Sequence, residues 1–119
     1  MSIVVAVTDS AEGARALSVA VPEAKLLGTD LVVVNLGLRP LDTSGYGDLS
    51  IVNRSGRNDQ DQAEVVLGAI SQHKASRLVI GVKRRTPVGK ALIGSLSQQL
   101  LLRSPVPVLA VKLDEDDED

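Results

Sequence analysis

The stretch GVKRRTPVGKALIGSLS, residues 81–97, joins an apolar run to an apolar segment, and the rest of the chain is organised around it. The run before it, Leu78–Ile80, predicts a buried strand, and the segment after it, Leu96–Arg103, predicts a helix. Glycines let a backbone fold closely round a ligand, and a helix start offers unpaired N–H groups. A phosphate-bearing ligand is the sharper interpretation, and a solvated basic turn is the alternative. The residues concerned are Gly81, Lys83, Arg84, Arg85, Gly89, Lys90, Gly94, Ser95 and Ser97.

Apolar β-branched runs alternate with helically spaced segments along the chain. The predicted strands are Ile3–Val7, Leu31–Leu36, Leu49–Arg54, Arg77–Ile80 and Val106–Leu113. The predicted helices are Ala11–Leu27, a segment opened by an Asp59/Gln62 capping box, and Leu96–Arg103 behind a Ser95/Gln98 capping box. We expect Pro22 to kink or split the first helix and Gly28 to end it. Gly37–Asp48 lacks a helical period and predicts an exposed loop.

Strands separated by helices imply parallel pairing through right-handed crossovers, which predicts a doubly wound, three-layer α/β sandwich with a mostly parallel five-stranded sheet. Ligands of such sheets bind outside the carboxyl ends of the strands, where the strand order reverses. Three segments occupy such ends: Thr8-Asp9-Ser10, Leu36-Gly37 and the loop after Gly81. They converge if the first and fourth strands are neighbours.

Composition narrows the function classes. The 119 residues suffice for one domain, with 44% apolar and 24% charged residues. Tyr46 is the only aromatic residue, so a run of bases has no stacking platform, which counts against a single-strand nucleic-acid binder. Cysteine is absent, so disulfides and thiolate metal sites are excluded. No apolar run reaches the length of a membrane span and no signal peptide opens the chain, so we expect a cytoplasmic protein without membrane contact.

Charge is distributed unevenly. Asp114–Asp119 are six of the fifteen acidic residues, which leaves nine acids against thirteen Lys and Arg in the remainder. Such a run repels itself, so we expect a domain over residues 1–113 and a disordered acidic tail over 114–119. The tail is either a solubilising end or a competitor for the basic loop.

The sequence does not match the known catalytic and phosphate-binding motifs. Gly89-Lys90 is not a Walker phosphate loop, because Arg84 and Ala91 stand where that motif needs a glycine and a hydroxyl. A dinucleotide fingerprint after the first strand is absent, and so is a metal-ligand cluster. His73 is the only histidine, so no Ser–His–Asp set can be formed, and we expect no catalytic residue and no metal site.

The order of elements and the pattern G-x2-R-x9-G-S-x-S over Gly81–Ser97 resemble the universal stress protein family. The flanking segments Val5–Ser10 (VAVTDS) and Ser104–Lys112 (SPVPVLAVK) are similar to that family as well. The likeness covers Ile3–Lys112 and is most specific in the last third. It implies an adenine-nucleotide alpha-hydrolase-like fold.

The resemblance also implies roles for individual residues. Nucleotide-binding members carry G-x2-G-x9-G-[ST], which Gly81, Gly94 and Ser95 match. Asp9, with Thr8 and Ser10 beside it, would hold the adenosine end, and Leu36 would contact adenine. The loop amides, the hydroxyls of Ser95 and Ser97, and the surrounding cations would hold phosphates. The implied ligand is ATP or another adenine nucleotide, such as AMP or cyclic AMP, with or without magnesium.

Two departures from the family pattern are visible. Arg84 replaces the second glycine of the motif, and it either blocks the nucleotide or pairs with its phosphate, reinforced by Lys83, Arg85 and Lys90. The Gly37–Asp48 loop stands where the family commonly has a helix, so one wall of the pocket would be open. The family also implies a homodimer through the last strand, Val106–Leu113.

Three functions remain open from the sequence. The first is a stress-response protein that binds ATP or a related adenine nucleotide at the glycine-rich basic loop, without catalysis or with slow hydrolysis at most. The second is a nucleotide-free dimeric regulator whose basic loop binds anions or a protein partner. The third and weakest is an adenylate-using enzyme on a related fold.

Overall fold

The computed structural model describes residues 2–37, 39–41, 43, 45–46, 49–53, 62–84 and 95–114. Strands and helices alternate along this part of the chain, as the periodicity predicts. In chain order the elements are β1 (Ser2–Val7), α1 (Ala11–Leu27), β2 (Asp30–Asn35), β3 (Ser50–Asn53), α2 (Gln62–Gln72), β4 (Ala75–Arg84), α3 (Ser95–Arg103) and β5 (Val108–Asp114).

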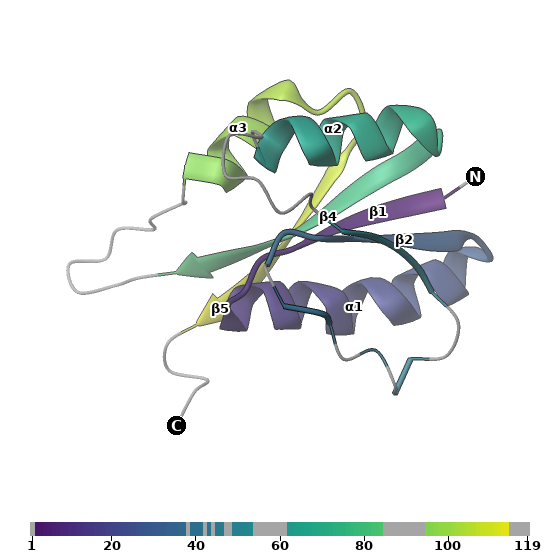
Figure 1. Ribbon diagram of the computed structural model, residues 1–119, viewed down its shortest axis with the longest axis horizontal. Helices are drawn as coiled ribbons and strands as arrows, with labels where there is room; N and C mark the ends of the chain where they lie inside the picture. Colours follow the sequence, from purple (N-terminus) through teal and green to yellow (C-terminus); the bar gives the residue numbers. More distant parts are fainter. Residues whose placement is uncertain are drawn as a thin grey trace.

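The five strands form one sheet in the order β3-β2-β1-β4-β5, and all four pairings are parallel. β1 therefore lies between β2 and β4, with Val4 opposite Val32 on one side and Leu78 on the other. Figure 1 shows α1 on one face of the sheet and α2 and α3 on the other. The doubly wound three-layer fold is confirmed, and the first and fourth strands are neighbours as the convergence of the three segments requires.

Two aliphatic layers hold the sandwich together, because successive side chains of a strand point to opposite faces. On β1, Val4 and Ala6 pack toward α2, whereas Ile3, Val5 and Val7 pack toward α1. All five side chains are buried, so β1 is covered on both faces, which explains its uninterrupted apolar sequence. None of the described helices is long and apolar enough to cross a membrane.

Two strands extend further than the sequence indicates. Gly81–Arg84, predicted as the beginning of a loop, continue β4, because Gly81 pairs with Val111 and Arg84 with Asp114. Asp114, predicted as the first residue of the acidic tail, is the last residue of β5. Pairing with a neighbouring strand supplies backbone hydrogen bonds that override the local preference of charged residues. The side chains of Lys83 and Arg84, and residues 85–94 and 115–119, lie outside what the structure describes.

The first helix is continuous, so the expected split at Pro22 does not occur. Pro22 is exposed, and the carbonyl of Ser18 that loses its amide partner there belongs to an exposed residue, so water can satisfy it. Gly28 ends the helix as predicted, with φ of 65° and its N–H bonded to the carbonyls of Ala24 and Lys25.

The first turn of α1 lies directly on the carboxyl ends of β1 and β4. A methyl group at Gly13 would overlap the backbone of Thr8, and one at Gly81 would overlap the carbonyl oxygen of Glu12. Both glycines therefore let backbone meet backbone, which no larger residue allows. This contact fixes where α1 begins relative to the two central strands.

The exit of β2 is held by the side chain of Asn35, which is 3% exposed. Its Nδ2 donates to the carbonyl oxygen of Arg39 at 2.9 Å and to Oδ1 of Asn53 at 3.1 Å. Its Oδ1 accepts from the N–H of Gly37 at 3.0 Å. One buried amide thus ties the segment after β2 to the neighbouring strand β3, and its donor and acceptor are both satisfied.

We predict opposite effects for two glycine-to-alanine changes. Gly81→Ala should lower the free energy of unfolding by at least about 2 kcal/mol, because its methyl group meets a backbone carbonyl that cannot move alone. Gly68→Ala should raise it by about 0.5–1 kcal/mol, because Gly68 lies within α2 with open space where the methyl group would sit. Urea denaturation of the two variants checks both signs, and equal effects would contradict the packing of α1 on β4.

Replacing Asn35 should also lower the free energy of unfolding. Asn35→Ala removes three hydrogen bonds around a buried site, and we expect a loss of roughly 2–3 kcal/mol in the free energy of unfolding. The matched control is Asn53→Ala, which removes one of the three at an exposed residue and should cost less than about 1 kcal/mol. Thermal and urea unfolding measure the difference, and equal losses would show that Asn35 is not the centre of this network.

Candidate functional site

The turn after β1 carries a helix cap. Ser10 is the N-cap of α1, and its Oγ accepts from the N–H of Gly13 at 3.1 Å. The hydroxyls of Thr8 and Ser10 share a hydrogen bond of 2.6 Å, and the N–H of Ser10 donates to the carbonyl oxygen of Thr8 at 2.9 Å. These bonds hold the turn in one conformation and leave Asp9 between two anchored residues, with its side chain 64% exposed.

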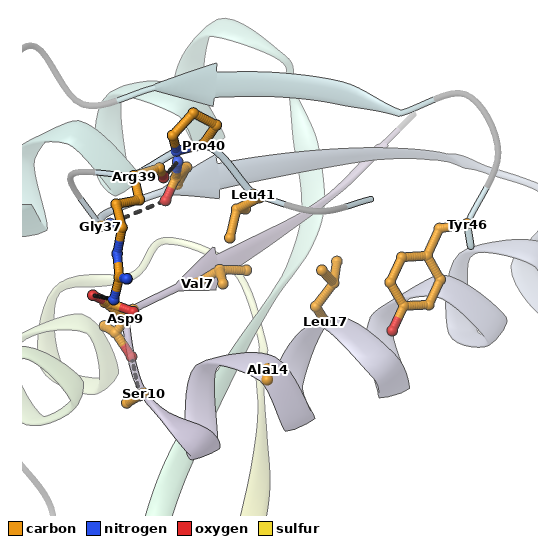
Figure 2. Close-up of a pocket in the computed structure, with 12 residues that line it drawn as sticks. Val7, Asp9, Ser10, Ala14, Leu17, Gly37, Arg39, Pro40, Leu41 and Tyr46 are labelled. Atoms are coloured by element: carbon orange, nitrogen blue, oxygen red, sulfur yellow. Dashed lines mark hydrogen bonds and ion pairs between the residues drawn. The ribbon is translucent and has the colours of Figure 1, made fainter. Parts of the chain in front are cut away.

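Asp9 faces the segment that leaves β2. The Nη2 atom of Arg39 lies 3.2 Å from Oδ2 of Asp9, in an ion pair whose two side chains are largely exposed. Figure 2 shows the guanidinium reaching from the segment after β2 to the carboxylate at the end of β1. Solvent screens such a pair, so it contributes little to stability and a ligand can displace it at low cost.

A pocket of about 370 Å³ lies between the ends of β1 and β2, the first two turns of α1 and the segment after β2. Its lining is mixed: carboxylate, hydroxyl and amide groups gather at one end, and aliphatic side chains and a phenol ring at the other (Figure 2). The lining residues are Val7, Thr8, Asp9, Ser10, Ala14, Leu17, Asn35, Gly37, Arg39, Pro40, Leu41 and Tyr46. Such a pocket suits a small molecule with a polar part and a flat or apolar part.

The carboxyl end of β4 adjoins the same turn of α1. Gly81 lies against the carbonyl of Glu12, and its own carbonyl oxygen accepts a long hydrogen bond of 3.4 Å from the hydroxyl of Ser97 on α3. The beginning of α1, the end of β4 and the beginning of α3 are thus joined by direct contacts. Among the described residues, no group of three or more His, Asp and Glu side chains is arranged to hold a metal ion.

Apart from Leu36, the site residues predicted from sequence fall into three groups. Thr8, Asp9 and Ser10 line the pocket. Gly81, Ser95 and Ser97 lie at the neighbouring end of β4 and the beginning of α3, outside the pocket lining. The remaining predicted positions, which are the side chains of Lys83 and Arg84 together with Gly89, Lys90 and Gly94, lie outside the described residues.

Leu36, which the resemblance predicts to contact adenine, is buried at the end of β2. Its side chain is 3% exposed and packs in the aliphatic layer that faces α2, and it does not line the pocket. Its N–H donates to the carbonyl oxygen of Val7 at 2.9 Å, which continues the pairing of β2 with β1 and turns the side chain away from the α1 face.

Sequence reasoning missed the other pocket residues. Asn35 could have been identified from the sequence, because it is a polar residue at the end of the apolar run that begins at Leu31. Leu17 has the periodicity of any core leucine, so nothing in its context indicates a pocket. Arg39, Leu41 and Tyr46 belong to the segment predicted as an exposed loop, and only its folding back over α1 brings them to the site.

The comparisons with known proteins agree with this fold. Residues 54–112 match the model of the Universal stress protein family. A universal stress protein of Mycolicibacterium smegmatis (strain ATCC 700084 / mc(2)155) is 54% identical over 52 residues, which are 44% of this chain. That alignment spans only 40% of the relative's length.

Solved structures extend the likeness over nearly the whole chain. A universal stress protein from Archaeoglobus fulgidus is 26% identical with a TM-score of 0.70, over 94% of this chain and 98% of that chain. A second structure from Archaeoglobus fulgidus, in complex with dAMP, has 23% identity and a TM-score of 0.64 over the same shares. A universal stress protein in complex with cAMP has 21% identity and a TM-score of 0.67 over 93% of this chain and 95% of that chain. The family match, the sequence relative and the fold all indicate the universal stress protein family.

Proposed function

We propose that this protein is a cytoplasmic stress-response protein that binds an adenine nucleotide at the carboxyl ends of β1, β2 and β4. The observation that carries the proposal is the pocket of about 370 Å³, which presents the carboxylate of Asp9 and the hydroxyl of Thr8 beside an apolar wall. Relatives of the same fold hold dAMP and cAMP, which are adenine nucleotides with one phosphate.

The polar end of the pocket suits a ribose. The carboxylate of Asp9 is an acceptor that the hydroxyls of a ribose or the amino group of adenine can reach once the exposed pair with Arg39 opens. The guanidinium of Arg39 is then free to meet a negatively charged group of the ligand. Arg39 therefore serves as the partner of Asp9 in the free protein and of the nucleotide in the complex.

The phosphate end belongs, in this proposal, to the glycine-rich basic loop and the beginning of α3. Gly81 and Ser97 support that placement, because they touch each other and Gly81 touches the same turn of α1 that follows Asp9. Lys83, Arg84, Gly89, Lys90, Gly94 and Ser95 complete the proposed phosphate contacts. The proposed ligands include ATP, with magnesium bridging its phosphates, and the function is binding, with slow hydrolysis at most.

Calorimetric titration of the purified protein with ATP, ADP, AMP and cyclic AMP, with and without magnesium, tests the proposal. We expect saturable binding of at least one of them, and Asp9→Asn should weaken it about tenfold or more, because a charged acceptor is replaced by a neutral amide. The control is Asp30→Asn, an exposed carboxylate at the opposite end of β2, which should bind as the unaltered protein does. Absence of binding for every nucleotide would overturn the proposal in favour of the nucleotide-free regulator.

We also propose a homodimer formed through β5. This strand is an edge of the sheet, and Leu109 and Ala110 on it are exposed. An exposed aliphatic edge strand is a ready template for pairing with a second chain.

Sedimentation should therefore give about twice the chain mass of 12.5 kDa. Leu109→Lys should reduce the mass to that of one chain, because it places charge in the apolar contact between the edges. Leu26→Lys, at an equally aliphatic exposed position near the end of α1, serves as the control and should remain dimeric. A monomeric mass for the unaltered protein would contradict the proposed dimer.

A further inference from the structure

The pocket beside Asp9 has two unlike ends, and the apolar end is the one that no predicted site residue explains. The far end from Asp9 is formed by Leu17 of α1 and by Leu41 and Tyr46 of the segment after β2. Figure 2 shows Tyr46 at the opposite end of the pocket from Asp9, with its ring directed toward α1 and Leu41 above the helix. These three side chains together enclose the apolar end of the pocket.

Tyr46 is held in place but is only partly buried in the core. Its N–H donates to the carbonyl oxygen of Thr43 at 3.0 Å, so a turn fixes its backbone. Its side chain is partly buried against the aliphatic layer that faces α1, while part of its surface lines the pocket. Within the described part of the chain the phenol hydroxyl has no hydrogen-bond partner. A ring with part of its face open to the pocket is suited to contact a flat ligand.

We propose that Tyr46 is the base-contacting residue of this site, and that the nucleobase lies along α1 over Leu17 with Tyr46 against it. The inference rests on the proposed function, because it assigns the base end of the same nucleotide site. Tyr46 is the only Phe, Tyr or Trp residue in the sequence, and its ring offers a purine a flat apolar surface. One ring serves one base, which is consistent with the lack of a platform for a run of bases.

Leu36 cannot take this role with its side chain, because it is buried on the other face of the sheet. The ligand is then extended along the ends of the strands. Its base reaches toward Tyr46, its ribose lies at Asp9, and its phosphate points toward Gly81. This order follows the order of the elements, since the segment after β2 and the end of β4 lie on opposite sides of β1.

The single tyrosine makes the test direct. The chain holds one tyrosine, one histidine and no tryptophan or phenylalanine, so the ring protons of Tyr46 and His73 are separate signals in a proton NMR spectrum. We expect AMP to shift the Tyr46 signals in step with the calorimetric binding curve, because the base adds its ring current. The His73 signals should stay in place, because His73 lies at the other end of β1, where its backbone carbonyl accepts a hydrogen bond from the hydroxyl of Ser2.

Variants give a second measurement that does not depend on the spectrum. Tyr46→Leu should lower the affinities for AMP and for adenosine by the same factor, about tenfold, because the lost contact is to the base that both ligands share. Tyr46→Phe keeps the ring and should stay within about twofold of the unaltered protein. Leu26→Ala, which removes an exposed aliphatic side chain at the far end of α1, should change neither affinity. Unfolding midpoints of the variants show whether each still folds.

Each outcome is decisive. Binding by calorimetry with unshifted Tyr46 signals overturns the role of Tyr46 and leaves nucleotide binding standing. A loss for AMP but not for adenosine in Tyr46→Leu places the contact at the phosphate and also overturns it. No binding of any adenine nucleotide to the unaltered protein overturns the proposed function and this inference together. Shifted signals with matched losses for both ligands support it.

Discussion

The contact between the first turn of α1 and the ends of the two central strands governs the rest of the molecule. Gly13 and Gly81 let the helix backbone rest directly on Thr8 and on β4, at a separation that a single methyl group would prevent. Because α1 begins immediately after Asp9, the same contact sets the position of that carboxylate. It also brings β4, and through Ser97 the beginning of α3, beside the exit of β1.

The pocket follows from how the chain passes from β2 to β3. In doubly wound folds a helix commonly makes such a passage, but the described residues between Asn35 and Ser50 contain neither helix nor strand. Leu41, Tyr46 and Leu49 of this segment pack on the α1 side of the core, and the first two also line the pocket together with residues of α1. Asn35, the last residue of β2, anchors the start of this segment through its hydrogen bonds to Gly37 and Arg39. Because the segment between β2 and β3 is irregular, a cavity remains between it and α1, and the ligand is proposed to lie there.

Most of the architecture could be predicted from local pattern. The apolar runs at β1 and β2, the periodic helix α1 and the glycine that ends it were identified within a residue or so, because burial on both faces and helical spacing leave plain marks in sequence. The errors arose where strand pairing or solvent exposure, neither of which is visible in the local sequence, determines the structure. Gly81–Arg84 look like a loop until β5 is placed beside them, and Pro22 looks like a helix breaker until its exposed side is known.

By itself the sequence determined the aliphatic core and the polar turn at Thr8–Ser10, which are properties of neighbouring residues. It also determined the class of fold and the parallel sheet, because strands that alternate with helices pair in parallel. The pocket was decided by tertiary structure alone. Asn35, Arg39 and Tyr46 are separated along the chain, and no local period links them to Asp9 or Leu17. The side on which Leu36 is buried likewise depends on how β2 continues its pairing with β1. A site made of residues from several segments exists only once packing brings those segments together, because periodicity reports which face of an element is buried and not what that face meets.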